Sequence, residues 1–209
     1  MTEDGITLID TWELPEDRIE ESIARWRERV GLIHTAPGFR NARLHRRLHP
    51  ESRLGLVNVA QWDSVEARDE ALAHPRFTAS AATAAGYATV RGGWYRVAAE
   101  SATTENNVGD GPGIAFVTAF ELPAERIDEW LPHWLGQAEL MSKEPGFRGS
   151  RLHRAVDPDT RFQLVGIAHW DSPGAWRAAH DGPRFRQHAS TAPGFATATP
   201  GLFRVAAEF

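Results

Sequence analysis

Residues 5–101 and residues 113–209 are two copies of one sequence. At a constant offset of 108 residues, 43 of the 97 paired positions are identical, and the pairing needs no gap. A unit of about 100 residues can hold a hydrophobic core of its own, whereas solenoid repeats span only about 20–45 residues. We therefore expect two domains of the same fold, at 1–101 and 113–209, joined by a linker over 102–112.

The first copy predicts seven segments, of which six are regular strands and helices. The first is an apolar alternating strand over 6–12, followed by a helix after Pro15 with apolar residues at 19, 23, 26, 30 and 33. A hairpin of strands over 39–48 and 53–62 comes next, and then a helix that is capped by Asp63-Ser64 and runs to about Ala73. A short helical or irregular piece starts at Pro75, and a last strand runs from about Gly93 to Glu100. This order is that of a ferredoxin-like α+β unit, which carries helices on one face of an antiparallel sheet.

One sheet face of each unit is left without helices and has to be buried. The other copy is the available partner, and the linker is long enough to reach across a domain as a coil. We therefore expect an intramolecular pseudo-dimer with the architecture of a dimeric α/β-barrel. Whether this pseudo-dimer pairs with a second chain stays open. In the second copy, Pro132 replaces Ala24 inside the first helix, and we expect it to kink this helix or remove a hydrogen bond.

Composition excludes several functions. The net charge is −5 and basic residues form no stripe, so we expect no nucleic-acid partner. Without cysteine there is no thiolate nucleophile, disulfide or iron–sulfur ligand, and with Lys143 as the only lysine most Schiff-base chemistry is excluded. No segment has the apolar length of a signal peptide or a membrane span, and we expect a cytoplasmic protein without membrane contact.

Several motifs occur in the same order in both copies. In the first copy Pro37-Gly38-Phe39 follows the first helix, and the third strand ends in Trp62-Asp63-Ser64 before an alanine-containing helix. This pattern resembles the antibiotic biosynthesis monooxygenase superfamily, and the tandem arrangement is similar to the ring-opening oxygenases of angucycline biosynthesis, as in the jadomycin and gilvocarcin pathways. The resemblance implies dimeric α/β-barrel architecture and oxygenase activity.

The resemblance also points to an amide and an indole as catalytic candidates. Anthrone oxygenases of this superfamily carry an asparagine four residues before the third-strand tryptophan, and here Asn58 precedes Trp62 by four. Positions four apart on a strand face the same side, so both side chains would project into one cavity. The second copy keeps Trp170 but has Gly166 in place of the amide. We expect two unequal cavities, with the first copy holding the working site.

Other residues are candidates for proton transfer and substrate binding. His45 or His169 is a candidate proton acceptor, although His45 shares its strand position with His153, which equally fits a scaffold role. The sequence has no closely spaced group of histidines and carboxylates that resembles a metal-binding triad, so we expect no metal. The substrate-binding candidates are Trp26, Arg43, Trp170 and Trp176.

These features predict an oxygenase that acts with dioxygen on a polycyclic aromatic polyketide. The angucycline resemblance implies reduced flavin (FADH2 or FMNH2) as a diffusible co-substrate from a partner reductase, and the alternative is a reaction without cofactor. Two other hypotheses remain. One is a non-enzymatic binder of a flat aromatic metabolite. The other is haem degradation, which the resemblance disfavours because the expected tryptophan and histidine positions hold Ala71 and Ala81, or Ala179 and Ala189.

Overall fold

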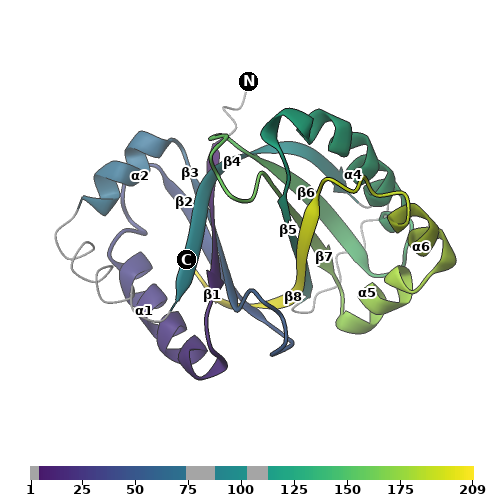
Figure 1. Ribbon diagram of the computed structural model, residues 1–209. Helices are drawn as coiled ribbons and strands as arrows, with labels where there is room; N and C mark the ends of the chain where they lie inside the picture. The colour runs from purple at the N-terminus through teal and green to yellow at the C-terminus, as the bar shows by residue number, and fades with distance from the viewer. Residues whose placement is uncertain (1–4, 74–87, 103–112) are drawn as a thin grey trace. The chain divides into compact units, whose positions relative to one another are not determined.

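The computed structural model describes residues 5–73, 88–102 and 113–209 (Figure 1). The segment expected from Pro75, and the expected linker apart from Ala102, lie outside these residues. The first copy contains β1 (Ile6–Glu13), η1 (Glu16–Arg18), α1 (Ile19–Gly31), β2 (Phe39–Arg47), β3 (Leu56–Trp62), α2 (Val65–Leu72) and β4 (Thr89–Ala102). The second contains β5 (Ile114–Glu121), η2 (Ala124–Arg126), α4 (Ile127–Met141), β6 (Phe147–Ala155), β7 (Leu164–Trp170), α5 (Pro173–His180), α6 (Pro183–Ala189) and β8 (Thr197–Glu208).

The eight strands form one closed barrel in which hydrogen-bonded neighbours follow the order β1-β3-β2-β8-β5-β7-β6-β4. The chain packs into two compact units: unit 1 comprises residues 1–96 and 205–209, and unit 2 comprises residues 97–204. The end of β8 therefore belongs to unit 1, and the end of β4 belongs to unit 2. The expected fold class, α+β with tandem ferredoxin-like repeats in a barrel, is confirmed.

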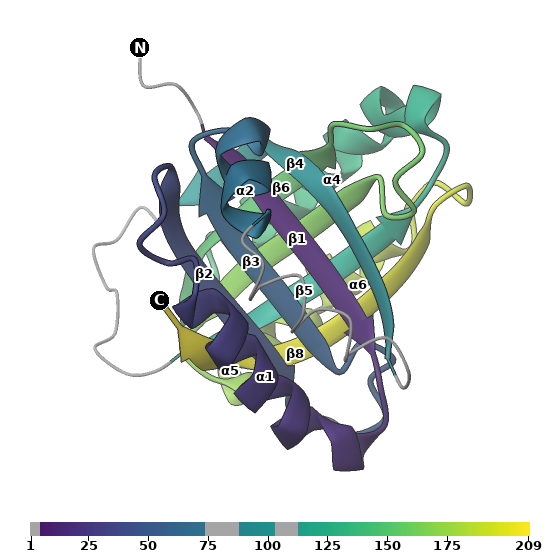
Figure 2. The same ribbon diagram turned by 90° about the vertical axis from the view of Figure 1, so that its left-hand side faces the viewer.

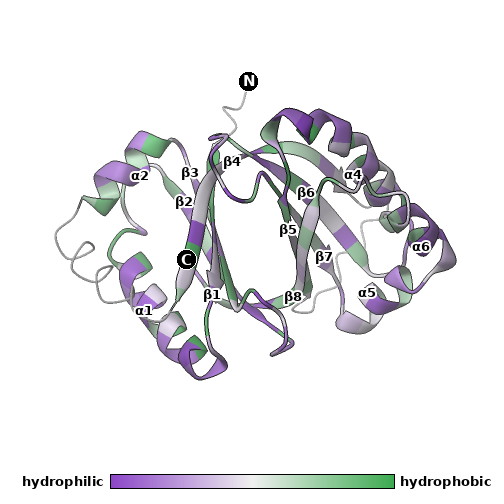
Figure 3. Cartoon of the chain, viewed as in Figure 1, coloured by the Kyte–Doolittle hydropathy of each residue, from purple (hydrophilic) through white to green (hydrophobic). Residues whose placement is uncertain are grey.

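In unit 1 the helices α1 and α2 lie on one face of the sheet (Figure 2). Strand β1 runs between β3 and β4, and its residue Asp10 pairs with Asn58 on one side and with Gly92 on the other. Helix α1 is amphipathic, with hydrophilic and hydrophobic residues alternating along it (Figure 3). Its buried residues include Ile19, Ile23, Trp26 and Val30, which join the sheet in one hydrophobic core.

Local sequence signals explain how each helix meets its strand. Gly38 has a φ of 82°, a left-handed conformation that glycine adopts without strain, and a Cβ there would lie 2.6 Å from the Cβ of Ala67. The Ser64 hydroxyl accepts the backbone N–H of Ala67 at 3.1 Å and caps α2. Gly146 and Ser172 repeat the turn and the cap in the second copy. The same turn and cap thus position α2 in the first copy and α5 in the second.

A β-bulge interrupts β2 near its start. The register between β2 and β3 shifts between Phe39 and Asn41, and the same shift occurs between Phe147 and Gly149 in the second copy. The extra residue places Phe39 and Ala42 on the same face of the sheet, which a regular period of two would not do. No helix in the part of the chain described by the structure is long and apolar enough to cross a membrane.

Candidate active site

A cavity in unit 1 lies between the two helices and the sheet. It encloses about 530 Å³ of space free of protein atoms, including its mouth. Its apolar wall includes four aromatic side chains, those of Trp12, Trp26, Phe39 and Trp62, beside aliphatic residues such as Val30 and Ile33. Four polar residues also line it: Asp10 from β1, Asn58 from β3, Arg29 from α1 and Arg68 from α2. The cavity therefore combines a surface suited to a flat ring system with charged and amide groups.

A chain of hydrogen bonds crosses the wall of this cavity. The indole N–H of Trp26 donates to Oδ1 of Asn58 at 3.2 Å, and Nδ2 of Asn58 donates to Oδ2 of Asp10 at 2.9 Å. An indole nitrogen can only donate, so the orientation of the Asn58 amide follows from its partner. The amide nitrogen of Asn58 has a second hydrogen that takes no part in these two hydrogen bonds. Asn58 is buried, with 6% of its surface exposed.

Asp10 is the carboxyl group of the cavity. Burial raises the pKa of the Asp10 carboxyl above its usual range, and this outweighs the lowering by the Asn58 hydrogen bond and by the positive charges of Arg68 and Arg29. A Cβ at Gly92, the residue paired with Asp10 on β4, would lie 2.1 Å from Oδ1 of Asp10. Glycine at this position thus leaves the room that the carboxylate occupies.

Two arginines bring positive charge to the cavity. Arg29 is buried, with 8% of its surface exposed, and its Cζ lies 5.6 Å from the ring centroid of Trp12. Arg68 lies with its Cζ 5.3 Å from the ring centroid of Trp94 and donates from Nη1 to Asp69 at 2.9 Å. Aromatic faces stabilise guanidinium groups that are partly removed from water. With Asp10 ionised, these three side chains carry a net positive charge.

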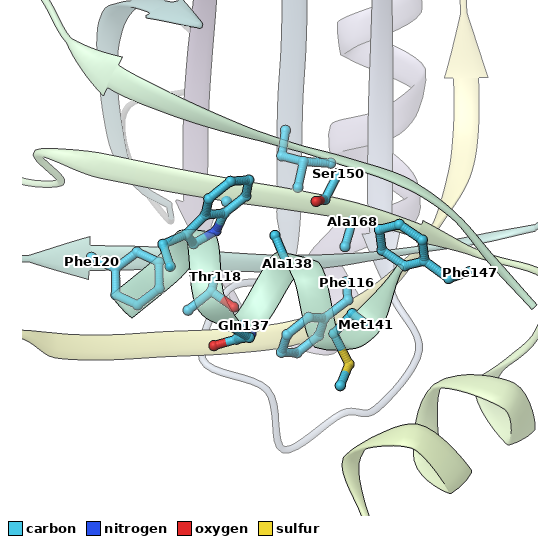
Figure 4. A pocket seen from close by; sticks show the side chains of 12 residues that line it. Phe116, Thr118, Phe120, Gln137, Ala138, Met141, Phe147, Ser150 and Ala168 are labelled. Atoms are coloured by element: carbon cyan, nitrogen blue, oxygen red, sulfur yellow. The ribbon is translucent and has the colours of Figure 1, made fainter. Parts of the chain in front are cut away.

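The matching pocket of unit 2 has lost these charges. It encloses about 400 Å³ and lies between α4 and strands β5, β6 and β7. Thr118, Gln137 and Gly166 occupy the positions of Asp10, Arg29 and Asn58. Figure 4 shows Thr118 and Phe120 towards one end, and Phe116, Met141 and Phe147 towards the other. Trp134, the equivalent of Trp26, has its Nε1 at 3.3 Å from the position that a Cβ of Gly166 would take.

The structure brings together three of the residues expected from the sequence. Trp26, Asn58 and Trp62 all line the cavity of unit 1. Trp62 is only 1% exposed and packs edge-on against Phe39, with ring centroids 5.2 Å apart. Trp26 contributes both its ring and its N–H, and its hydrogen bond to Asn58 is a link that sequence spacing does not reveal.

The expected proton acceptors and Arg43 lie outside this cavity. His45 follows Leu44, which is in the core beneath the helices, so His45 is on the opposite face of the sheet, where its Nδ1 lies 3.2 Å from the carbonyl oxygen of Val57. His169 is exposed on β7 of unit 2. Arg43 is exposed and forms an ion pair with Glu208 at 3.3 Å. The structure does not place any of the three beside Asn58.

The two tryptophans proposed for the second copy do not line its pocket. Trp170 is fully buried against Phe147, with ring centroids 5.2 Å apart. Trp176 packs against Phe116 and against His180, with ring centroids 5.1 and 4.4 Å apart. Both therefore support the pocket from behind its wall.

The histidines that are specific to the second copy lie beside its helices. His133 on α4 stacks on His188 of α6 with ring centroids 4.3 Å apart, and Nε2 of His188 lies 2.9 Å from the carbonyl oxygen of His133. Burial lowers the pKa of His133 and that of His180. Within the described residues, no group of three or more histidine or carboxylate side chains is arranged to hold a metal ion.

Sequence reasoning missed three polar residues of the cavity. Asp10 is an acid within an apolar alternating strand, at a position where the second copy has Thr118. Arg29 follows Trp26 by three residues and so faces the sheet with the apolar stripe of α1. The sequence therefore held a signal for Asp10 and for Arg29, because a charged residue at a core-facing position has to find partners or line a cavity. Arg68 gives no comparable signal, because its helix has no clear apolar face.

Fold and cavity together define a class: tandem ferredoxin-like α+β proteins with an aromatic cavity between helices and sheet. A family model described as antibiotic biosynthesis monooxygenase matches residues 5–83 and again residues 113–191. The chain belongs to the antibiotic biosynthesis monooxygenase family, and it is an enzyme of the oxygenase type. The resemblance inferred from the sequence motifs is confirmed.

Individual relatives agree with this assignment. A mycobilin-producing heme oxygenase of Mycobacterium tuberculosis is 33% identical over 76 residues, which are 36% of this chain and 70% of the relative. An anthrone oxidase-like protein has a TM-score of 0.78 at 17% identity, covering 100% of this chain and 94% of its own. A Fusobacterium nucleatum protein provisionally assigned as a monooxygenase has a TM-score of 0.70 at 10% identity, covering 100% and 95%. At these identities the two structures establish the fold.

Proposed function

We propose that the chain is an oxygenase that uses dioxygen on a phenolic, polycyclic aromatic polyketide of the angucycline type, with unit 1 as the working site. One observation carries the proposal: in unit 1 alone of the two pockets, a hydrogen-bonded amide and carboxyl pair, Asn58 and Asp10, faces an aromatic cavity. The pocket of unit 2 has no charged residue in its wall. Insertion of oxygen, followed by cleavage of a ring carbon–carbon bond, is the reaction that the angucycline resemblance suggests.

The side chains of the cavity have separate tasks in this proposal. Trp26 and Trp62 form walls for a flat ring system and exclude water from it. The second N–H of the Asn58 amide donates to a substrate oxygen on which negative charge develops. Because Trp26 and Asp10 fix the amide on both sides, little reorganisation is needed when this charge appears.

Electrons for the reaction come from outside the protein. The chain has no cysteine, and the phenolic substrate, once ionised, is itself an electron donor to dioxygen. Reduced flavin from a partner reductase is the other source, and as a diffusible co-substrate it would supply the activated oxygen. In either case the protein binds and orients the ring system and keeps the site dry.

Oxygen consumption tests this function. The purified full-length chain is mixed with hydroxylated angucyclinones and anthrones, first alone and then with a flavin reductase, flavin and reduced nicotinamide. We expect substrate-dependent oxygen uptake and an oxygenated product in at least one of the two conditions. Tight binding of these compounds without oxygen uptake in either condition would favour the non-enzymatic binder instead.

Exchange of the amide tests the choice of site. We expect Asn58→Ala to lower turnover at least about 100-fold, because it removes a preorganised donor. The matched change in unit 2, Gly166→Ala, adds only a methyl group, 3.3 Å from Nε1 of Trp134, and should leave turnover nearly unchanged. Equal losses in the two variants would contradict the assignment to unit 1. Circular dichroism of both variants controls for folding.

Haem degradation remains a second candidate because of the similarity to the heme oxygenase of Mycobacterium tuberculosis. None of the described residues that line either cavity is a histidine, so no imidazole among them would hold a haem iron. Haemin titration distinguishes this candidate from the first. A Soret shift at one equivalent, with bilin formation under reducing conditions, would favour haem degradation over polyketide oxidation.

A further inference from the structure

The cavity of unit 1 contains a group that can accept a proton, but it is a carboxylate and not a histidine. We propose that Asp10 is a catalytic residue that takes the proton from a phenolic hydroxyl of the bound substrate. This inference rests on the proposed function and identifies how the substrate becomes an electron-rich anion. His45, the candidate from the sequence, lies on the other face of the sheet.

The geometry leaves Asp10 free to act in this way. Its Oδ2 accepts a hydrogen bond from Asn58, whose amide orientation is fixed by the indole of Trp26. Its Oδ1 lies above the backbone of Gly92, where no side chain fills the space. A carboxylate has about four lone-pair positions, and Asn58 takes one of them. Asp10 lines the cavity and is half-buried, so a ligand hydroxyl can reach it.

The charges around Asp10 suit the transfer. The phenol O–H bond breaks, the proton forms an O–H bond with the Asp10 carboxylate, and the bonding electron pair stays on the substrate oxygen as an anion. Negative charge thus moves from Asp10 to a neighbouring oxygen in the same cavity, while the positive charges of Arg29 and Arg68 persist. The arginines that stabilised the carboxylate then stabilise the substrate anion, and the net charge of the cavity is unchanged.

Other titratable groups near Asp10 do not compete for this role. Tyr95 is buried on β4, and burial together with the negative charge of Asp10 raises the pKa of its phenol, so it stays protonated. The guanidinium groups of Arg29 on α1 and Arg68 on α2 have donors but no acceptor atom for a proton. Burial raises the pKa of the Asp10 carboxyl, which makes it a stronger base than an exposed aspartate. These are the groups that act on Asp10 within the described residues.

The second copy offers a natural control. Thr118 occupies the same strand position as Asp10, in the smaller pocket of unit 2, whose wall has no carboxylate. Asp10→Asn keeps size and hydrogen bonding but removes the base, and Asp10→Thr introduces a residue that the repeated fold already accommodates. Thr118→Val, which changes only the pocket of unit 2, is the matched control and should behave as the wild type.

The proton transfer is measured without oxygen first. Hydroxyanthraquinones of graded phenol acidity, which change colour on ionisation, are titrated anaerobically into the full-length protein. We expect the wild type and Thr118→Val to bind them in ionised form below their solution pKa, and Asp10→Asn to bind them as neutral phenols. If Asp10→Asn does not fold, Asp10→Thr gives the same comparison. Equal ionisation in the wild type and the Asp10 variant, or no binding at all, would overturn the inference.

Turnover then separates this inference from the proposed function. We expect Asp10→Asn to lower kcat about 100-fold or more with weakly acidic phenols and little at a pH above the phenol pKa, where the substrate is already ionised. Rescue by pre-ionised substrate distinguishes a base from a merely structural residue. An unchanged kcat overturns the role of Asp10 and leaves the oxygenase in place. Ionisation on binding without oxygen uptake supports Asp10 and contradicts the oxygenase.

Discussion

Asn58 and Asp10 differ together between the two copies, and physical chemistry explains why. Asn58 donates a hydrogen bond to the Asp10 carboxylate, and a carboxylate in a partly buried position that loses a donor costs free energy. A copy that loses the amide is therefore expected to lose the acid as well. Unit 2 has Gly166 and Thr118 at these positions. Two coupled substitutions thus convert a charged pocket into a neutral one.

Buried histidines are expected to make unit 2 sensitive to acid, and His153, with 4% of its surface exposed, is the most deeply buried of those whose pKa is lowered. Burial lowers the pKa of His153 to about 4 from the usual 6.5, in spite of the contact between its Nδ1 and the Val165 carbonyl. Between these two pH values the unfolded chain binds a proton that the folded chain does not, so stability falls as pH decreases through this window. The shift corresponds to about 3 kcal/mol at its lower end. We expect His153→Gln to flatten the pH dependence of the unfolding free energy between pH 6.5 and 4.

Urea denaturation at several pH values measures this effect. His49→Gln is the control, because the His49 side chain is 43% exposed, and it should retain the wild-type slope. His153→Gln is expected to be less stable than the wild type at pH 7, since it replaces a well-packed ring. A wild-type slope in His153→Gln would mean that other groups cause the acid sensitivity.

At the scale of single elements, α4 contains a proline that α1 does not have. Helix α4 continues from Ile127 to Met141 through Pro132, so the helix is retained while the backbone hydrogen bond from residue 132 is lost. Since packing of Trp130 and Trp134 holds the helix in place, we expect Pro132→Ala to stabilise the protein by about 1–3 kcal/mol. Guanidinium denaturation measures the change.

The first copy supplies the reverse experiment. Ala24 is exposed at the same position of α1, and Ala24→Pro should destabilise the protein by about 3 kcal/mol. An Ala24→Pro variant with unchanged stability would indicate that this turn of the helix contributes little to stability in either copy. It would also contradict the expectation for Pro132→Ala.

The elements were largely predictable, and the exceptions have physical causes. Hydrophobic periodicity and turn residues predicted each strand and helix of the first copy, but β4 begins at Thr89, four residues before the expected start. Gly92 lies before the expected start, but in the structure it is part of β4 and leaves space for Asp10 on β1. The bulge after Phe39 was not predicted, because an extra residue in one strand depends on the partner strand and leaves no local pattern.

At the scale of the whole molecule, the repeat predicted more than any motif did. It determined the number of units, their fold and the unequal pockets, and the spacing of Asn58 and Trp62 correctly placed both at one cavity. Hydrophobic periodicity does not show which polar side chains contact one another, so the hydrogen bond between Asn58 and Asp10 was not predicted. The repeat does not reveal an exchange of strand ends between the two units. Residues 97–101 end the first copy but pack in unit 2, and residues 205–209, which look alike in sequence, pack in unit 1.

This exchange has a consequence for how the protein is made. Unit 1 includes Val205–Phe209, and Ala42 and Phe209 exchange backbone hydrogen bonds of 3.1 and 3.0 Å, while Phe209 packs on Trp26 with ring centroids 5.8 Å apart. A domain at the start of a chain ordinarily folds while the ribosome is still at work. Here residues 205–209 are synthesised only after most of the second copy, so one edge of the unit 1 sheet stays unpaired until they have been translated.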